Sequence, residues 1–104
     1  MTTLEKEIEA KLVRIVKDAG GLCLKWVCPG WAGVPDRMIL LPGGHVIFVE
    51  TKRPKGGVLS SRQKWWGKKL QGLGFPYWAV WSWGNLAEFE KSMLKMQKTS
   101  EGKI

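Results

Sequence analysis

The segment 45–52 constrains the fold more than any other stretch of the sequence. Its centre, Val46-Ile47-Phe48-Val49, is apolar at four successive positions, and the side chains of a strand alternate between two faces. A strand that is apolar on both faces must be covered on both sides. Pro54 ends this strand, because proline cannot donate to a strand ladder. The sequence therefore predicts a central strand in a layered α/β domain.

The periodicity of apolar residues predicts the other elements. A helix is expected over 4–19, ended by Gly20 and Gly21. Strands are expected over 22–27, 37–41 and 75–83, and a second helix over about 60–72. Asn85 is expected to cap a last helix. The order α-β-β-β-α-β-α predicts a small mixed sheet flanked by helices. We expect one domain over residues 1–98 and a flexible C-terminal tail over 99–104.

Turn residues relate the strands to one another. Pro42-Gly43-Gly44 separates the strand 37–41 from the strand 45–52, and both glycines can adopt a positive φ. These two strands should therefore form an antiparallel hairpin. A helix separates the strand at Val46 from the strand that ends near Val80, so those two should be parallel with a right-handed crossover.

The hairpin brings three chemically useful side chains together. Glu50 and Lys52 leave the same face of their strand, about 6.6 Å apart along it. Asp36 begins the partner strand, so it lies beside the end of the second strand. Adjacent carboxylates repel one another, and Mg²⁺ relieves that repulsion because it prefers oxygen ligands. The backbone carbonyl of Thr51 is a further candidate ligand, and a lysine beside such a metal can stabilise charge on a phosphate.

The charge distribution indicates the partner. The 104 residues include 17 Lys and Arg against 9 Asp and Glu, a net charge of +8. No acidic residue lies between Thr51 and Ala87. That segment contains seven basic residues, namely Lys52, Arg53, Lys55, Arg62, Lys64, Lys68 and Lys69. Such a surface favours a polyanion such as DNA, although a basic surface alone does not separate binding from cleavage.

Other function classes lack support in the sequence. Cys23 and Cys28 with the single His45 do not make a tetrahedral zinc site, so we expect two reduced thiols. No apolar run approaches the roughly 20 residues that a membrane span needs, and the N-terminus lacks a signal-peptide core. The expected location is the cytoplasm.

Several motifs together resemble a known family. They are Gly33-Val34-Pro35-Asp36-Arg37, Val46-Ile47-Phe48-Val49-Glu50-Thr51-Lys52, Pro54, Leu59-Ser60, Gln63 and Leu70. This set resembles the VRR-NUC domain, the virus-type replication-repair nuclease branch of the PD-(D/E)XK superfamily. The resemblance runs from about Glu5 to Trp83 and is to the stand-alone phage form. If the chain is phage-encoded, the cytoplasm in which we expect it is that of the host cell. It implies a restriction-endonuclease-like core.

The resemblance also implies roles for particular residues. Asp36 and Glu50 match the metal-binding acids, and Lys52 matches the catalytic lysine. Gln63 matches a glutamine that lies near the scissile region, although its spacing from Ser60 equally fits a helix cap. A glutamate of the first helix often completes the metal site.

Glu5, Glu7 and Glu9 of the first helix compete for that place. Glu7 points away from the apolar stripe of the helix, whereas Glu5 and Glu9 flank it. Glu9 fits the E-x-x-L register and the distance to Gly20 of the similar archaeal Holliday-junction resolvases, and it is preferred. Glu5 is second. The number and identity of the metal ions stay open at this point.

The expected function is that of a Mg²⁺- or Mn²⁺-dependent endodeoxyribonuclease. It would cut four-way (Holliday) junctions as a homodimer, since two symmetric sites can cut two strands. Nucleases for flaps, splayed arms or single strands, and a non-catalytic DNA-binding module, are the alternatives. The residues expected to contact DNA are Arg37, Arg53, Lys55, Arg62, Lys64 and Lys68.

The seven tryptophans are unusual for a chain of 104 residues. Most should be buried in the core or in an interface. Trp78 is expected to face inward, opposite to Tyr77, Trp81 and Trp83. Trp31, with Trp65 or Trp66, is the better candidate for stacking on an unpaired base, and a dimer interface is the alternative use of such a surface.

Overall fold

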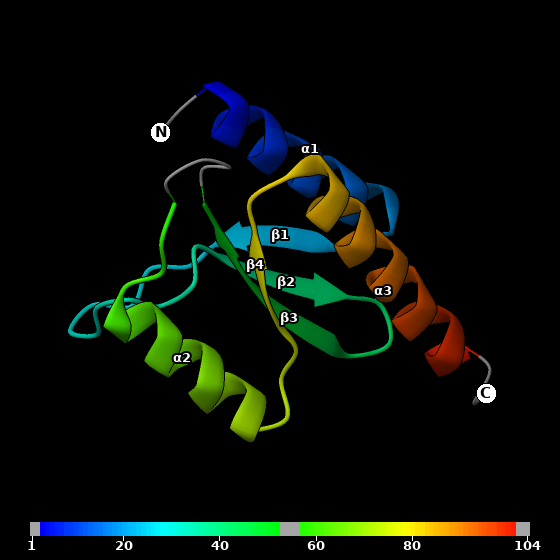
Figure 1. Cartoon of the computed structure of the whole chain (residues 1–104). Coiled ribbons are helices and arrows are strands. Elements are labelled where there is room, and N and C mark those ends of the chain that lie inside the picture. Colours follow the sequence, from blue (N-terminus) through cyan, green and yellow to red (C-terminus); the bar gives the residue numbers. More distant parts are fainter. Residues whose placement is uncertain (1–2, 53–56, 102–104) are drawn as a thin grey trace.

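A computed structural model describes residues 3–52 and 57–101 of the chain. These residues form a four-stranded sheet with helices on both of its faces. The elements in chain order are α1 (Thr3–Asp18), β1 (Leu22–Lys25), β2 (Arg37–Leu41), β3 (His45–Thr51), α2 (Ser61–Gly72), β4 (Tyr77–Val80) and α3 (Trp83–Glu101). In Figure 1, α1 and α3 lie together on one face of the sheet and α2 lies on the other.

The sheet is mixed, as predicted. Its strand order is β1-β2-β3-β4. β2 is antiparallel to both β1 and β3, and β3 is parallel to β4. The pairing of Leu41 with His45 leaves Pro42, Gly43 and Gly44 as the turn of the hairpin. Both glycines have positive φ, 92° and 79°, which confirms the predicted turn.

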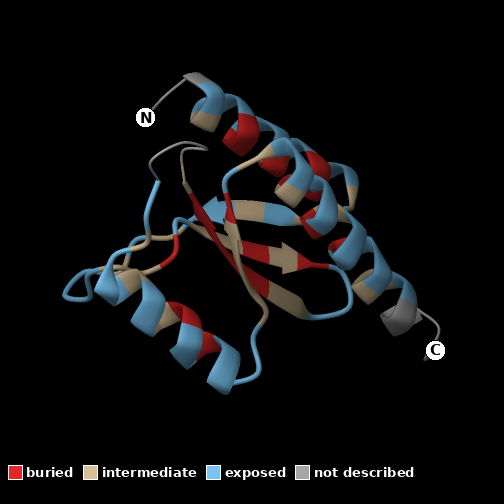
Figure 2. Ribbon diagram, in the orientation of Figure 1, coloured by how far each residue is buried: buried red, intermediate tan, exposed pale blue. Residues whose placement is uncertain are grey.

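The alternation of side chains along β3 divides the interior into two layers. Ile47 and Val49 face α1 and α3, where they join a buried cluster that includes Leu12 and Phe89. Phe48 faces the other way and contacts the rings of aromatic residues under α2. Figure 2 shows the buried residues concentrated in β3 and on the inner sides of the helices. The apolar run thus forms a strand covered on both faces, as the sequence predicts.

The last helix begins earlier than expected. The Ser82 hydroxyl accepts a hydrogen bond from the Asn85 N–H (3.1 Å), and the Ser82 carbonyl accepts one from Leu86 (2.9 Å). Ser82 is therefore the cap of α3, and the prediction of Asn85 in that role is wrong. The Asn85 side chain instead accepts a hydrogen bond from the Trp81 N–H at 3.1 Å.

The ends of three other elements also differ from expectation. β4 ends at Val80 rather than at residue 83, because the Trp81 N–H is bound to the Asn85 side chain and not to a neighbouring strand. β1 ends at Lys25 rather than at residue 27. α3 continues to Glu101, so residues 99–101 of the expected tail are helical. The remainder of that tail, 102–104, lies outside the described residues.

Candidate active site

The end of the β2–β3 hairpin fixes the position of Asp36. One oxygen of its carboxylate, Oδ2, accepts two hydrogen bonds from Thr51, from the backbone N–H at 3.1 Å and from the hydroxyl at 2.9 Å. The N–H and C=O of one strand residue leave the same edge of the strand. The Thr51 carbonyl is therefore directed to the edge of β3 on which Asp36 lies, and its role as a metal ligand stays a prediction.

Glu50 is buried with only half of its carboxylate satisfied. The residue is 2% exposed. Its Oε1 accepts a hydrogen bond from the Gln63 side chain at 3.0 Å. Its Oε2 is buried and has no hydrogen-bond partner among the described residues. A buried polar atom without a partner costs free energy, so this oxygen is free to bind a ligand that the chain itself does not supply.

The electrostatics of Glu50 are consistent with a cation site. Burial raises the pKa of Glu50 to about 8, and the charge of the neighbouring Asp36 carboxyl adds to the rise. The Lys52 ammonium partly opposes this change. The raised pKa favours the protonated form of Glu50 in the chain without metal. Two adjacent carboxyl groups, one with an unpartnered oxygen, are a donor set that suits Mg²⁺ or Mn²⁺.

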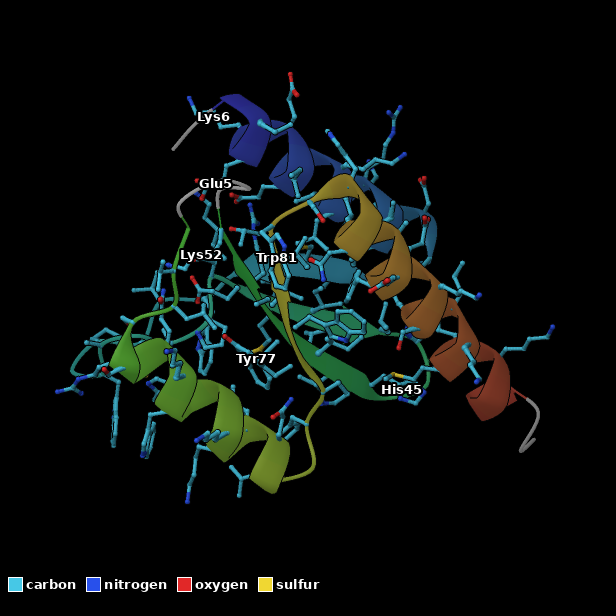
Figure 3. All side chains as sticks on the ribbon, in the orientation of Figure 1. Glu5, Lys6, His45, Lys52, Tyr77 and Trp81 are labelled. Carbon is cyan, nitrogen blue, oxygen red and sulfur yellow. The ribbon has the colours of Figure 1, made fainter. Side chains whose placement is uncertain are left out.

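Lys52 follows β3 immediately and shares the face of Glu50. Its backbone N–H donates to the Val80 carbonyl at 2.9 Å, which holds the end of the strand against β4. The side chain borders a hollow of about 250 Å³ whose other lining residues include Ala79 and Trp81. Figure 3 shows Lys52 at one end of β3 and His45 at the other, so the single histidine lies far from this site.

Gln63 forms the helix cap that the sequence left open, and its side chain also contacts Glu50. The side-chain Oε1 of Gln63 accepts a hydrogen bond from the Ser60 backbone N–H at 2.8 Å. The backbone N–H of Gln63 donates to the Ser60 hydroxyl at 3.1 Å. These two bonds form the predicted capping box of α2. Its Nε2 donates to Glu50. One side chain therefore joins the start of α2 to the buried carboxylate.

Tyr77 is a member of this cluster that the sequence reasoning did not include. Burial raises its pKa to about 12, and the charges of Glu50 and then Asp36 add to the effect. Its hydroxyl is buried and unpartnered within the part of the chain that the structure describes. The ring packs against Gly67, where an added Cβ would come within 2.9 Å of it. Only the β3–β4 register, which pairs Tyr77 with Phe48, brings it to this face.

The structure brings Glu9 to Arg37 instead of to the two carboxylates. The Glu9 carboxylate lies 2.6 Å from the Arg37 guanidinium, and the two side chains are 11% and 12% exposed, in that order. Arg37 also donates to the Cys23 carbonyl at 3.2 Å. Arg37 pairs with Val49 and so faces α1. No group of three His, Cys, Asp or Glu suited to a metal occurs among the described residues, so metal binding by Glu9 stays a prediction.

Most of the residues predicted to contact DNA lie either on the exposed side of α2 or outside the described residues. Arg62, Lys64 and Lys68 are exposed on α2. Arg53 and Lys55 lie outside the described residues. Glu5 is in the first turn of α1, and Figure 3 draws it at the end of the molecule where Lys52 also lies. Cys23 and Cys28 are free thiols.

The fold is similar to that of a known class of domain. No family model matches the chain. A solved structure described as "VRR_NUC domain" superposes with a TM-score of 0.80 at 23% identity, covering 86% of this chain and 97% of that one. The chain therefore has the fold of the VRR_NUC domain, with the mixed sheet and flanking helices that the sequence predicts.

A similar sequence comes from a bacteriophage. "Putative nuclease p44" of Acyrthosiphon pisum secondary endosymbiont phage 1 is 52% identical over 50 residues, which are 48% of this chain and 54% of that protein. The match thus spans about half the length of the curated relative. Together the two comparisons bear out the predicted resemblance to a phage VRR-NUC domain. Among the described helices, none is long and apolar enough to cross a membrane.

Proposed function

We propose that the chain is a metal-dependent DNA endonuclease with its active site at Asp36, Glu50 and Lys52. The observation that carries the proposal is the buried, unpartnered Oε2 of Glu50 beside the Asp36 carboxyl. An acid pair of this kind lowers the stability of the fold when no cation is bound, because desolvated like charges resist joint ionisation. The fold and the phage relative agree with a nuclease.

The residues divide the work of hydrolysis among them. Asp36 and Glu50, with the Thr51 carbonyl, would hold the cation. When bound, a divalent metal supplies Lewis-acid stabilisation of phosphate charge and lowers the pKa of water. The Lys52 ammonium, on the same face as Glu50, orients the attacking water and offsets charge on the phosphate as the bond to the leaving oxygen breaks. Gln63 positions Glu50.

The substrate that we propose is branched DNA, cut by a homodimer. The basic side chains exposed on α2 lie on the same face of the sheet as Glu50 and suit a DNA backbone. One chain carries one such acid pair and can cut one strand. Paired cleavage of a four-way junction needs two copies related by a twofold axis.

A cleavage assay on labelled junction, flap and duplex DNA tests the proposal. We expect cleavage with Mg²⁺ or Mn²⁺ and none with a chelator. Asp36→Asn should abolish cleavage and leave junction binding intact, and Asp18→Asn, a change at an exposed acid that ends α1, is the matched control. Cleavage retained by Asp36→Asn would refute the site, and binding without any metal-dependent cleavage would favour a non-catalytic module.

Cleavage of DNA with a single-stranded arm is a second candidate function. It is favoured by a specific observation, namely a group of half-exposed tryptophans beside the basic helix. Symmetric paired nicks on a junction would favour the junction nuclease, and faster cleavage of a flap or splayed arm would favour this alternative. Sedimentation measurements of the free protein test the homodimer.

A further inference from the structure

Three tryptophans and one arginine enclose a hollow on the surface beside the start of α2. The hollow has a volume of about 290 Å³ and is lined by Trp31, Ser61, Arg62, Trp65 and Trp66. Trp31 comes from the loop before Asp36, and the other residues come from the first turns of α2. Trp31 is 55% exposed and Trp65 is 50% exposed. Aromatic surface of this extent is costly to leave in water unless a partner covers it.

The three rings are arranged as a floor and two walls. Trp31 and Trp65 each meet the Trp66 ring nearly edge-on, at interplanar angles of 77° and 90° and centroid distances of 5.7 and 5.2 Å. Trp66 is fixed beneath them, because its indole N–H donates to the Ala32 carbonyl at 3.0 Å and its ring contacts Trp26. Flat ring faces are thus available in a hollow that is already formed.

The position of Trp31 is also set by the backbone. The Trp31 N–H donates to the Cys28 carbonyl at 3.1 Å, which closes a turn in the loop. Gly33 lies so close to α2 that an added Cβ would approach the Arg62 Cβ to 2.6 Å. The loop is therefore packed directly against the helix. A ligand that enters the hollow meets rings whose ordering cost has already been met in folding.

Charge and size indicate what the hollow accepts. Arg62 lines it, other basic residues follow on α2, and no acidic residue lies between Thr51 and Ala87. A volume of about 290 Å³ is at the small end of ligand pockets. It suits one flat ring system attached to an anionic chain. Stacking on aromatic side chains is how proteins bind unpaired bases, and Arg62 is placed to contact the adjoining phosphate.

The hollow is close to the acid pair of the proposed active site. Trp31, the loop residue that lines it, precedes Asp36 by five residues, and five residues of chain span at most about 18 Å. Arg62, which lines it from α2, is followed by Gln63, which contacts Glu50. At about 3.4 Å per nucleotide of a stacked strand, the hollow lies within about five nucleotides of the acids.

We propose that Trp31, Trp65 and Trp66 form a subsite for one unpaired base of the DNA substrate. This proposal rests on the proposed function for its substrate class. It predicts that DNA with a single-stranded arm or an unpaired base is bound more tightly than blunt duplex of the same paired sequence. It gives the chain a means of selecting DNA structure without reading base sequence, because every base has a stacking face.

Binding in the presence of a chelator tests the subsite separately from cleavage. Fluorescence anisotropy would compare a labelled fork that has a short thymine arm with the blunt duplex. Trp31→Ala should weaken fork binding by roughly 5- to 150-fold, the range expected for one lost stack, and change duplex binding less than about twofold. Trp31→Phe should restore most of the affinity, and Trp31→Leu should not.

Two further variants guard against indirect effects. Trp65→Ala removes the second wall from a different element and should act in the same direction. Leu94→Ala removes a half-exposed apolar side chain from α3, on the other face of the sheet, and should leave both affinities unchanged. Fork binding by Trp31→Ala at the wild-type level would overturn the subsite. A change from dimer to monomer in the same variant would also overturn it, since the hollow would then be an interface between copies.

The two proposals fail in distinguishable ways. A chain that never cleaves DNA but loses fork affinity on Trp31→Ala retains the subsite without the nuclease function. A chain that cleaves DNA through Asp36 but binds the fork equally well without Trp31 retains the nuclease function without the subsite.

Discussion

Replacement of Glu50 by glutamine should remove the pH dependence of stability that the buried acid creates. Between its ordinary pKa of 4.5 and its folded value of about 8, the folded chain holds a proton that the unfolded chain has released. The free energy of unfolding therefore falls as the pH rises through this window. Glu50→Gln keeps the shape of the side chain and an acceptor for Gln63, but it cannot ionise.

The magnitude follows from the size of the pKa difference. One pKa unit corresponds to about 1.4 kcal/mol, so the full shift would destabilise the metal-free wild type by roughly 4–5 kcal/mol above about pH 8. Relaxation and entry of water around the ionised acid reduce this effect, and we expect about 2–3 kcal/mol. That is a large part of the roughly 5–15 kcal/mol that stabilises a domain of this size.

Urea unfolding with a chelator present measures the difference. Wild type and Glu50→Gln should have nearly equal free energies of unfolding at about pH 4.5 and diverge toward about pH 9, with the variant more stable. Added Mn²⁺ should stabilise the wild type at high pH by mass action and leave the variant unchanged. If the two curves stay parallel across this range, the reasoning about a protonated, metal-poised Glu50 is refuted.

Three other changes have expected outcomes. Gly33→Ala should destabilise the fold by about 2 kcal/mol or more in urea unfolding, because a positive φ and a clash with α2 combine. Gly30→Ala, with a similar φ and open space, should cost only about 1–2 kcal/mol. Gln63→Ala should slow metal-dependent cleavage about 10- to 100-fold. Ser60→Ala, which removes only the helix cap, should cost about 1 kcal/mol of stability. Equal cleavage rates for Gln63→Ala and Ser60→Ala would contradict the role of Gln63 in positioning Glu50. Phe89→Ala should cost about 3–5 kcal/mol by calorimetry.

The parts of the structure that the sequence predicts are those set by local geometry. The turn at 42–44 fixes the pairing of β2 with β3, and that pairing alone brings Asp36 to the end of β3 beside Glu50 and Lys52. Ser60 and Gln63 lie within one turn of helix, so their capping box is visible as a spacing. Such features need no knowledge of how distant segments pack.

The parts that it does not predict depend on distant packing or on competing local signals. The Glu9–Arg37 ion pair requires the placement of α1 on the sheet, and Tyr77 reaches the acids only through the β3–β4 register. At the start of α3, Ser82 and Asn85 are both good capping residues. The Trp81 N–H decides between them, because it takes the Asn85 side chain as its acceptor.

The exposed turn at 42–44 limits how this protein can vary or be engineered. Surface turns usually accept insertions, tags and new chain ends with little penalty. Here one added residue that slid β3 against β2 would exchange the two faces of the strand, moving Glu50 into the apolar layer and Val49 out of it. The length of the 42–44 turn therefore has to be kept for the site to form, although the turn lies at the opposite end of the hairpin from Asp36 and Glu50.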